Sequence, residues 1–221
     1  MNIERFIPLN FTKINIEQIR KEAAKFRNLL NKRRSVRYFS QESVPYEVIE
    51  DLVMTASSAP SGAHKQPWTY CIIGNSVIKQ AIRAAAEKEE YDNYHGRMSD
   101  EWLDDLKPFD TDWHKDFLTE APWLIVLFKK SYNIEGEAKS KNYYVTESVG
   151  ISAGMLITAI HAAGLVTLTH TPSPMNFLQH ILARPENEKP FLLLPVGYPR
   201  AGVLVPNLKR KEVSDVIVKY L

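Results

Sequence analysis

The chain has 221 residues, of which 44% are apolar and 24% charged, enough to bury the core of one well-packed domain. Lys and Arg number 28 against 26 Asp and Glu, and a net charge of +2 argues against nucleic acid as the main partner. The single cysteine, Cys71, excludes an internal disulfide and a cysteine-rich metal site, and it fits a reducing, cytoplasmic setting.

The first part of the chain predicts two helices and a loop. The opening residues, MNIERFIPLNFTK, lack the basic start and the apolar run of a secretory signal, so we expect no leader. Apolar positions at helical spacing predict a helix from Ile16 to Lys32, whose basic end suits the exposed carbonyls of a helix C-terminus. Pro45 favours the start of a second helix that runs to about Ser57. The sequence Ala-Pro-Ser-Gly-Ala-His then predicts a loop.

The middle of the chain predicts alternating strands and helices. Residues Trp68 to Gly74 have the composition of a strand, and a helix follows from Ser76, as N-cap, to about Tyr91. Residues Asn93 to Thr119 are rich in charge and aromatics and have no dominant period. The apolar runs Trp123 to Phe128 and Phe191 to Val196 are typical of strands covered on both faces. We therefore expect the centre of the sheet there.

One stretch requires a membrane test. Val149 to Leu168 is long and mostly apolar, but Ser152, Thr158 and His161 interrupt it. Gly164 followed by Leu-Val-Thr-Leu predicts that a helix stops there and a strand begins. We therefore expect a buried central helix rather than a membrane span.

A basic cluster is the clearest candidate for anion binding. Residues Lys32 to Arg37 (KRRSVR) place four cations and a hydroxyl within six residues, which can grip a phosphate. The residues alone favour a solvated helix end that complements the helix dipole. A second cluster, Lys209 to Lys211, could converge on the same anion. The chain contains neither G-x-G-x-x-G nor G-x-x-x-x-G-K-[ST], which disfavours Rossmann and P-loop nucleotide binding.

The order of these motifs resembles a known family. The series R-R-S-V-R, P-S-G-A-H, Thr169 to Pro172 (THTP) and Val205 to Lys211 (VPNLKRK) is similar to the FMN-binding elements of the iodotyrosine deiodinases, within the nitroreductase superfamily. The similarity extends over roughly residues 25 to 215. It implies an α+β fold of the three-layer α/β type, with a central mixed sheet flanked by helices, one nitroreductase-like domain over 1–221 and an intertwined homodimer.

The same resemblance assigns a cofactor site for FMN. Four residues would hold the phosphate and ribityl chain, and Ser61 and Arg210 would add further contacts; these four are Arg33, Arg34, Ser35 and Arg37. Thr169, His170 and Thr171 would lie beside the flavin ring. Thr171 would offer its hydroxyl to flavin N5 and so take the catalytic role. The family commonly has threonine where this chain has His170, which leaves a side-chain contact at that position open.

A second set of residues would recognise the substrate. Glu90 and Tyr94 are four residues apart, so a helical turn puts them on one face, and Lys115 follows later. A carboxylate, a phenol and an ammonium complement the zwitterion of an amino acid. The set matches the substrate-recognition residues of the deiodinases. The same resemblance implies that the backbone N–H of Ala63 donates a hydrogen bond to the substrate phenolate. The polar segment at about 88–118 predicts a lid that covers the substrate.

The resemblance implies FMN-dependent reductive dehalogenation of halotyrosines, whereas the chemistry of the residues themselves indicates an FMN enzyme that recognises an aromatic amino acid. Two alternatives stay open: a general FMN-dependent NAD(P)H nitroreductase or quinone reductase, and a flavin or amino-acid binding protein without turnover. No motif identifies the electron donor, for which an NADPH-linked reductase is one candidate. The six histidines lack metal-binding spacing, and Cys71, in an apolar strand, is expected to be a buried core thiol. We expect no metal, no nucleic acid and no membrane partner.

Overall fold

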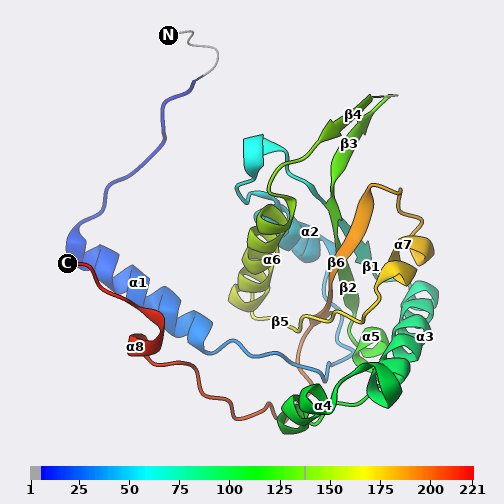
Figure 1. Ribbon diagram of the computed structural model, residues 1–221. Helices are drawn as coiled ribbons and strands as arrows, with labels where there is room; N and C mark the ends of the chain where they lie inside the picture. Colours follow the sequence, from blue (N-terminus) through cyan, green and yellow to red (C-terminus); the bar gives the residue numbers. More distant parts are fainter. Residues whose placement is uncertain (1–5, 137) are drawn as a thin grey trace. The chain divides into compact units, whose positions relative to one another are not determined.

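The computed structural model describes residues 6–136 and 138–221 (Figure 1). Contacts within the chain divide it into two units, Met1–Arg33 and Arg34–Leu221, and each is described by itself. In the first, helix α1 spans Ile16–Asn31, and the side chain of Asn15 caps it by accepting a hydrogen bond from Gln18 N. The helix was predicted to end at Lys32 but ends at Asn31, so its last turn contains no basic residue. The basic run begins at the C-cap, Lys32.

A four-stranded sheet forms the centre of the second unit. Its order is β1-β2-β6-β5, and every neighbouring pair is antiparallel. The strands are β1 (Trp68–Ile73), β2 (Trp123–Lys130), β6 (Glu188–Gly197) and β5 (Val166–Thr167). A single parallel bridge between Ser35 and Thr167 adds the start of this unit to the edge of the sheet. The two apolar runs thus form the two central strands, as predicted.

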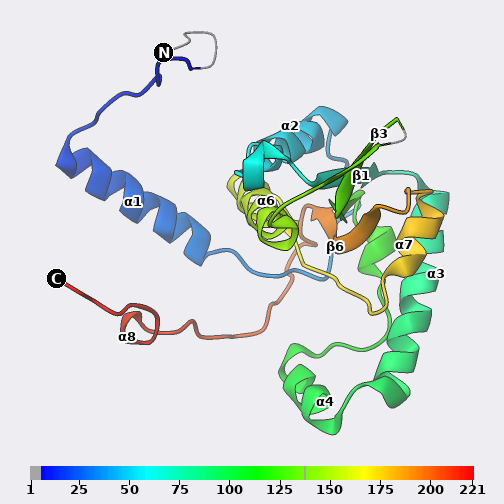
Figure 2. The ribbon, with the colours of Figure 1, turned by 45° about the horizontal axis from the view of Figure 1, so that its top comes forward.

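Alternation along β2 divides the core into two layers. Ile125 and Leu127 face the cluster that contains α2 (Tyr46–Ser57) and α6 (Val145–Ala162). Leu124, Val126 and Phe128 face the opposite cluster, with α3 (Ser76–Asp92), α5 (Phe117–Glu120) and α7 (Asn176–Ile181). Both ribbon views show helices on the two faces of the sheet (Figures 1 and 2). Because successive side chains of a strand point to opposite faces, one apolar run serves both layers.

The long apolar stretch forms α6, which begins four residues earlier and ends earlier than the stretch itself. By length and composition α6 could cross a membrane, with 33% of that window buried inside the chain. Its buried side chains, among them Val149, Leu156 and Ile160, pack in the core beneath α2. Gly164 then adopts φ +80, a left-handed conformation that suits glycine, and β5 begins at Val166. The predicted helix stop and following strand are confirmed.

Two local features differ from the predictions. Helix α3 is capped by Asn75, whose side chain accepts hydrogen bonds from Val77 N and Ile78 N, so Ser76 is the first helical residue and not the N-cap. Both residues are good caps, and asparagine takes the position one residue earlier. The hairpin of β3 (Tyr132–Glu135) and β4 (Ala138–Lys141) was not predicted.

Shorter elements complete the unit. The loop Ala-Pro-Ser-Gly-Ala-His contains the 3-10 turn η2 (Gly62–His64), and α8 (Val213–Val216) lies near the C-terminus. After α3 come a π-helical turn η3 (Asn93–Arg97), α4 (Asp100–Leu106) and the 3-10 turn η4 (Lys107–Phe109). This succession of short elements accounts for the lack of a single period in the segment.

The packing of α6 gives a test of the core. Leu156 is fully buried, so Leu156→Ala should lower the free energy of unfolding by about 2–5 kcal/mol because it loses apolar burial and leaves a cavity. Urea unfolding at fixed protein concentration measures the change. Val77→Ala, at an exposed helical position, is the control and should stay within about 0.5 kcal/mol. An equal effect of both substitutions would contradict this description of the core.

Candidate active site

A cavity of about 420 Å³ opens between the end of α3, the segment that follows it and the residues between β5 and α7. This volume is in the range of small-molecule sites. Seven of the residues that the sequence singles out line it: Arg37, Glu90, Tyr94, Lys115, Thr169, His170 and Thr171. Residues that are 134 positions apart in sequence are therefore gathered in one place by the fold.

The threonine run is held by the central sheet. His170 N donates to Leu193 O at 2.9 Å, and Leu193 N donates to His170 O at 3.1 Å. Both backbone polar groups of His170 are thus bonded to β6. The backbone N–H is therefore not available to a bound molecule, whereas the carbonyl oxygen keeps a second lone pair.

The side chain of His170 is buried and packs edge-on against Phe117, with ring centroids 5.3 Å apart. Its Nε2 is buried and has no hydrogen-bond partner among the described residues. Burial first, and then the positive charges of Lys115 and Arg37, lower the pKa of His170 to about 3. The imidazole is therefore neutral at physiological pH, and it keeps a buried nitrogen without a partner among the described residues.

An ion pair lies at the other side of the cavity. Lys115 Nζ is 3.3 Å from Glu90 Oε2, and the two side chains are only 7% and 10% exposed. Lys115 Nζ also donates to the carbonyl of Asp112 and lies 5.4 Å from the centre of the Tyr94 ring. The Tyr94 hydroxyl is 3.0 Å from Thr111 Oγ1, and burial raises the pKa of Tyr94, so the phenol stays protonated. One negative and one positive charge thus stand side by side with a neutral hydroxyl.

The basic cluster meets the C-terminal segment. A second cavity of about 270 Å³ is lined by Ser35, Arg37, Val205, Pro206 and residues 108–110. Arg34 donates to the carbonyls of Pro206 and Leu208, the latter at 3.5 Å. Burial lowers the pKa of Arg37, whose guanidinium lies 5.9 Å from the ring centre of Phe109. The segment that leads to Arg210 is thus placed beside Arg34 and Ser35. Arg33 belongs to the first unit.

Two predicted residues lie elsewhere in the chain. Ser61 accepts a hydrogen bond from Gln66 N at 2.9 Å, and Gly62 N donates to Ser148 Oγ, at the start of α6, at 3.4 Å. Ala63 has φ 49 and ψ 31, the left-handed region that is costly for a residue with a Cβ. Neither Ser61 nor Ala63 belongs to the lining of the 420 Å³ cavity.

The cavity also contains apolar residues that the sequence analysis missed. Met98, Trp102 and Leu106 come from the segment that includes α4 and line the same cavity. Their four-residue spacing, with the N-cap Ser99 between the first two, is a helical signal that the high charge of the segment concealed. These side chains give the site an apolar wall.

Two further groups have no place in this site. Cys71 is half-buried in β1 rather than fully buried, and burial raises the pKa of its thiol, which lowers its reactivity. Within residues 6–136 and 138–221, no cluster of three or more His, Cys, Asp or Glu side chains is suited to a metal ion.

Similarity to known proteins first establishes the protein family. The profile of the Nitroreductase family matches residues 30–198, so the chain belongs to the nitroreductase family. It is 58% identical to the iodotyrosine deiodinase of Haliscomenobacter hydrossis, over 97% of each chain. It is 46% identical to that of Hydra vulgaris, over 98% of this chain and 80% of the relative. Within the nitroreductase family, the chain therefore belongs to the iodotyrosine deiodinases.

A solved structure agrees with this membership. Oxidized iodotyrosine deiodinase bound to FMN and 3-iodo-L-tyrosine superimposes with a TM-score of 0.75 at 31% sequence identity, over 89% of this chain and 98% of that chain. The three-layer fold predicted from the sequence is thereby confirmed.

The chemistry of the cavity fits a flavin nucleotide. Arg37 supplies a cation for a phosphate, Thr169 and Thr171 supply hydroxyls, and His170 supplies an unpaired buried nitrogen. Met98, Trp102 and Leu106 add an apolar surface to the same lining.

His170 gives a test by pH. In the unfolded chain this histidine takes up a proton near pH 6.5, whereas in the folded chain it stays neutral down to about pH 3. The unfolded state therefore binds more protons between these two pH values. The contribution of His170 to the free energy of unfolding is fully present above pH 6.5 and is lost progressively as the pH falls below it. The loss is about 2 kcal/mol at pH 5, at about 1.4 kcal/mol per pH unit.

Urea unfolding of the wild type and of His170→Thr at pH 7.5 and pH 5 measures the contribution. The wild type should lose about 2 kcal/mol more than the variant on acidification. Equal losses in the two proteins would show that His170 is not held neutral.

Proposed function

We propose that this protein is an FMN-dependent reductive dehalogenase that converts halotyrosines, such as iodotyrosine, to tyrosine and halide. The observation that carries the proposal is the meeting of Glu90, Tyr94 and Lys115 with Arg37 and the threonine run in one cavity. The first three residues fit an amino-acid zwitterion, and the others fit a flavin nucleotide. A general nitroreductase needs only the second set.

The cofactor would be held mainly from its phosphate end. Arg33, Arg34, Ser35 and Arg37 would bind the phosphate and ribityl chain, with Arg210 reaching the same group from the segment that packs beside Arg34. Since Arg34 donates to two backbone carbonyls, binding FMN would either redirect its guanidinium or use its remaining N–H groups. Thr169 and His170 would contact the ring system. FMN, when bound and reduced, supplies the two electrons of the reaction.

The substrate would exchange one ion pair for two. Glu90 and Lys115 already face each other across 3.3 Å. A zwitterion placed between them gives its ammonium to Glu90 and its carboxylate to Lys115, while the Tyr94 hydroxyl donates to the same carboxylate. Each buried charge keeps an opposite partner throughout, so the desolvation of the pair is compensated before and after binding.

The remaining residues would orient the halogenated ring and exclude water. Cleavage of the carbon–halogen bond consumes two electrons and one proton at the ring carbon and releases halide. The backbone N–H of Ala63 would donate to the phenolate, and the Thr171 hydroxyl would donate at flavin N5. The lid at about 88–118, with Met98, Trp102 and Leu106 on its inner side, would close over the ring.

We infer a homodimer from the faces that a single chain leaves open. A methyl group added to Gly150 or Gly154 would meet no atom within 4 Å, and Ile151 between them is 48% exposed. Tyr144, at the start of α6, is 73% exposed, which excludes a core role for it within one chain. Small residues on an exposed helix face allow two helices to approach closely. The helix α1 also has no buried residue in the described part of the chain.

The electron donor and the location are inferred from the sequence and from the one cysteine. No nicotinamide-binding motif is present in the sequence, so we expect a separate reductase, with NADPH as one source of electrons. A free half-buried thiol fits a reducing compartment, and we expect the protein in the cytoplasm.

Substitutions in the zwitterion site test the substrate. Glu90→Gln and Tyr94→Phe should each weaken iodotyrosine binding about tenfold or more while FMN stays bound, because each removes one hydrogen bond to a charged group. Quenching of flavin fluorescence measures the affinity.

The neighbouring residues on α3 provide matched controls. Glu89 pairs with Arg97 and Tyr91 is 47% exposed, and neither lines the cavity. Glu89→Gln and Tyr91→Phe should leave the affinity within about twofold. Unchanged affinity in Glu90→Gln and Tyr94→Phe, with nitroaromatic compounds reduced efficiently, would favour a general nitroreductase.

Thr171 tests the catalytic role. Thr171→Ala should retain FMN and iodotyrosine but lower kcat for iodide release at least about tenfold, because one preorganised donor is lost. Thr171→Ser, which keeps the hydroxyl, should recover most of the rate. Anaerobic iodide release from the chemically reduced protein gives the measurement. If the wild type itself released no halide, the protein would bind its ligands without turnover.

A further inference from the structure

Arg83 and Glu87 are two charged residues of α3 that lie just outside the cavity, and Glu87 contacts Lys115. Arg83 and Glu87 precede Glu90 on the same helix, with four residues from Arg83 to Glu87 and three from Glu87 to Glu90, so the three share one face. Neither Arg83 nor Glu87 belongs to the lining of the 420 Å³ cavity. Their role must therefore be exerted through other residues.

Glu87 binds the backbone of Lys115. Its Oε1 accepts a hydrogen bond from Lys115 N at 2.8 Å, while the carbonyl of Lys115 accepts from Leu118 N at 2.9 Å. Both backbone polar groups of Lys115 are thus satisfied by fixed partners. Leu118 and its neighbour Phe117 are buried in the core beneath the sheet.

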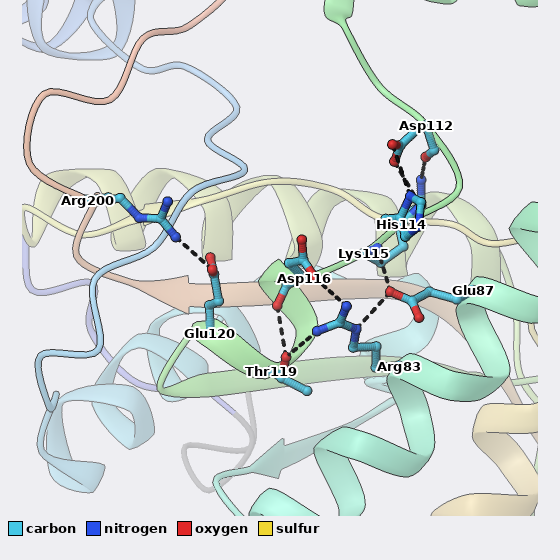
Figure 3. Close-up of polar contacts among 9 residues, drawn as sticks. All are labelled: Arg83, Glu87, Asp112, His114, Lys115, Asp116, Thr119, Glu120 and Arg200. Atoms are coloured by element: carbon cyan, nitrogen blue, oxygen red, sulfur yellow. Dashed lines mark hydrogen bonds and ion pairs between the residues drawn. The ribbon is translucent and has the colours of Figure 1, made fainter.

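Arg83 joins this contact to α5. Its Nε donates to Glu87 Oε1 at 2.7 Å and its Nη1 to Thr119 Oγ1 at 3.0 Å, while Nη2 pairs with Asp116. Figure 3 shows the guanidinium between these three side chains, with Lys115 above Glu87. A planar fork that reaches three acceptors fixes their relative positions more firmly than a flexible ammonium could.

The arrangement also directs the charge of Lys115. Glu87 is 18% exposed and would compete with Glu90 for the Lys115 ammonium, but Arg83 occupies the same oxygen that accepts the Lys115 backbone N–H. The ammonium pairs instead with Glu90, inside the cavity. Because Glu87 is paired with Arg83, Glu90 is left to hold the Lys115 ammonium where a substrate carboxylate would arrive.

We propose that Arg83 and Glu87 are positioning residues that hold the backbone of Lys115 and thereby set the selectivity of the cavity for a ligand carboxylate. The inference rests on the proposed role of Lys115 in zwitterion binding. A long side chain loses rotamer entropy when it is fixed, so a backbone that is already fixed reduces the freedom that remains to be lost on binding.

The test compares two ligands in the FMN-bound protein. One is 3-iodotyrosine, and the other is 3-iodotyramine, which keeps the ring and the ammonium but lacks the carboxylate. Glu87→Ala should weaken iodotyrosine binding about tenfold and iodotyramine binding less than about threefold, with kcat for iodotyrosine within about twofold. A role in general folding would weaken both ligands alike.

A double-mutant cycle shows whether Glu87 acts through Lys115. In a Lys115→Met background, Glu87→Ala should weaken iodotyrosine binding by less than about twofold, because the group that it positions is absent. Its full effect in that background, or equal weakening of both ligands by Glu87→Ala, would overturn the inference. If Lys115→Met alone did not reduce the preference for iodotyrosine over iodotyramine, the zwitterion site itself would be wrong, and the inference would fall with it.

Matched variants separate positioning from the loss of an ion pair. Glu120, also on α5, pairs with Arg200 at 2.6 Å and has no contact with Lys115 in the described structure, so Glu120→Ala should leave both affinities unchanged. Glu87→Gln keeps an oxygen for the Lys115 N–H and should recover part of the affinity. Should Glu87→Ala fail to retain FMN, Arg83→Lys takes its place, since it keeps the charge and loses the fork. Loss of selectivity in Glu120→Ala equal to that in Glu87→Ala would contradict the inference.

Discussion

The buried ion pair between Glu90 and Lys115 is the interaction on which the site depends. Removing two charges from water costs several kcal/mol, and their mutual attraction offsets this only where other groups complete their hydrogen bonds. Here the Asp112 carbonyl accepts from the ammonium and the Tyr94 ring lies beside it. Such a pair contributes little to stability for its cost. In the proposed function, its value lies in keeping two opposite charges in the cavity, each of which can exchange its partner for one group of a zwitterion.

The packing of helices on the sheet determines where the Glu90–Lys115 ion pair forms. Strand β2 buries one set of side chains against α3 and α5, the helix that carries Glu90 and the helix that follows Lys115. Strand β6 holds the threonine run through the two hydrogen bonds between His170 and Leu193. Because both strands are neighbours at the centre of the sheet, Glu90, Lys115 and the threonine run meet at the same layer of the fold. The packed core therefore fixes the positions of cavity residues that are far apart in the sequence.

The sequence reveals those parts of the structure that rest on local signals. The two apolar runs predict β2 and β6, and Gly164 predicts the end of α6, since a strand covered on both faces and a left-handed turn each restrict composition. The hairpin β3–β4 was not predicted because its two strands are only four residues long each and mainly polar. The contact of Glu87 with the backbone of Lys115 leaves no trace in sequence, because almost any residue at position 115 supplies an N–H. Predicting that Glu90 and Lys115 lie together required the resemblance to a family as well as the chemistry of their side chains.

The division of the site residues argues for two chains. The loop that carries Ser61 and Ala63 packs against the start of α6, in the layer that includes α2, whereas the cavity opens in the layer of α3 and α5. Both ribbon views place this loop far from α4 (Figures 1 and 2). Ala63 keeps a left-handed backbone that costs free energy, and such strain persists where the surrounding structure or a function requires it. If Ala63 donates to the substrate phenolate, the donor must come from a second copy, across the open face of α6 that Gly150 and Gly154 provide. The dimer would then be a condition for dehalogenation and not only for stability.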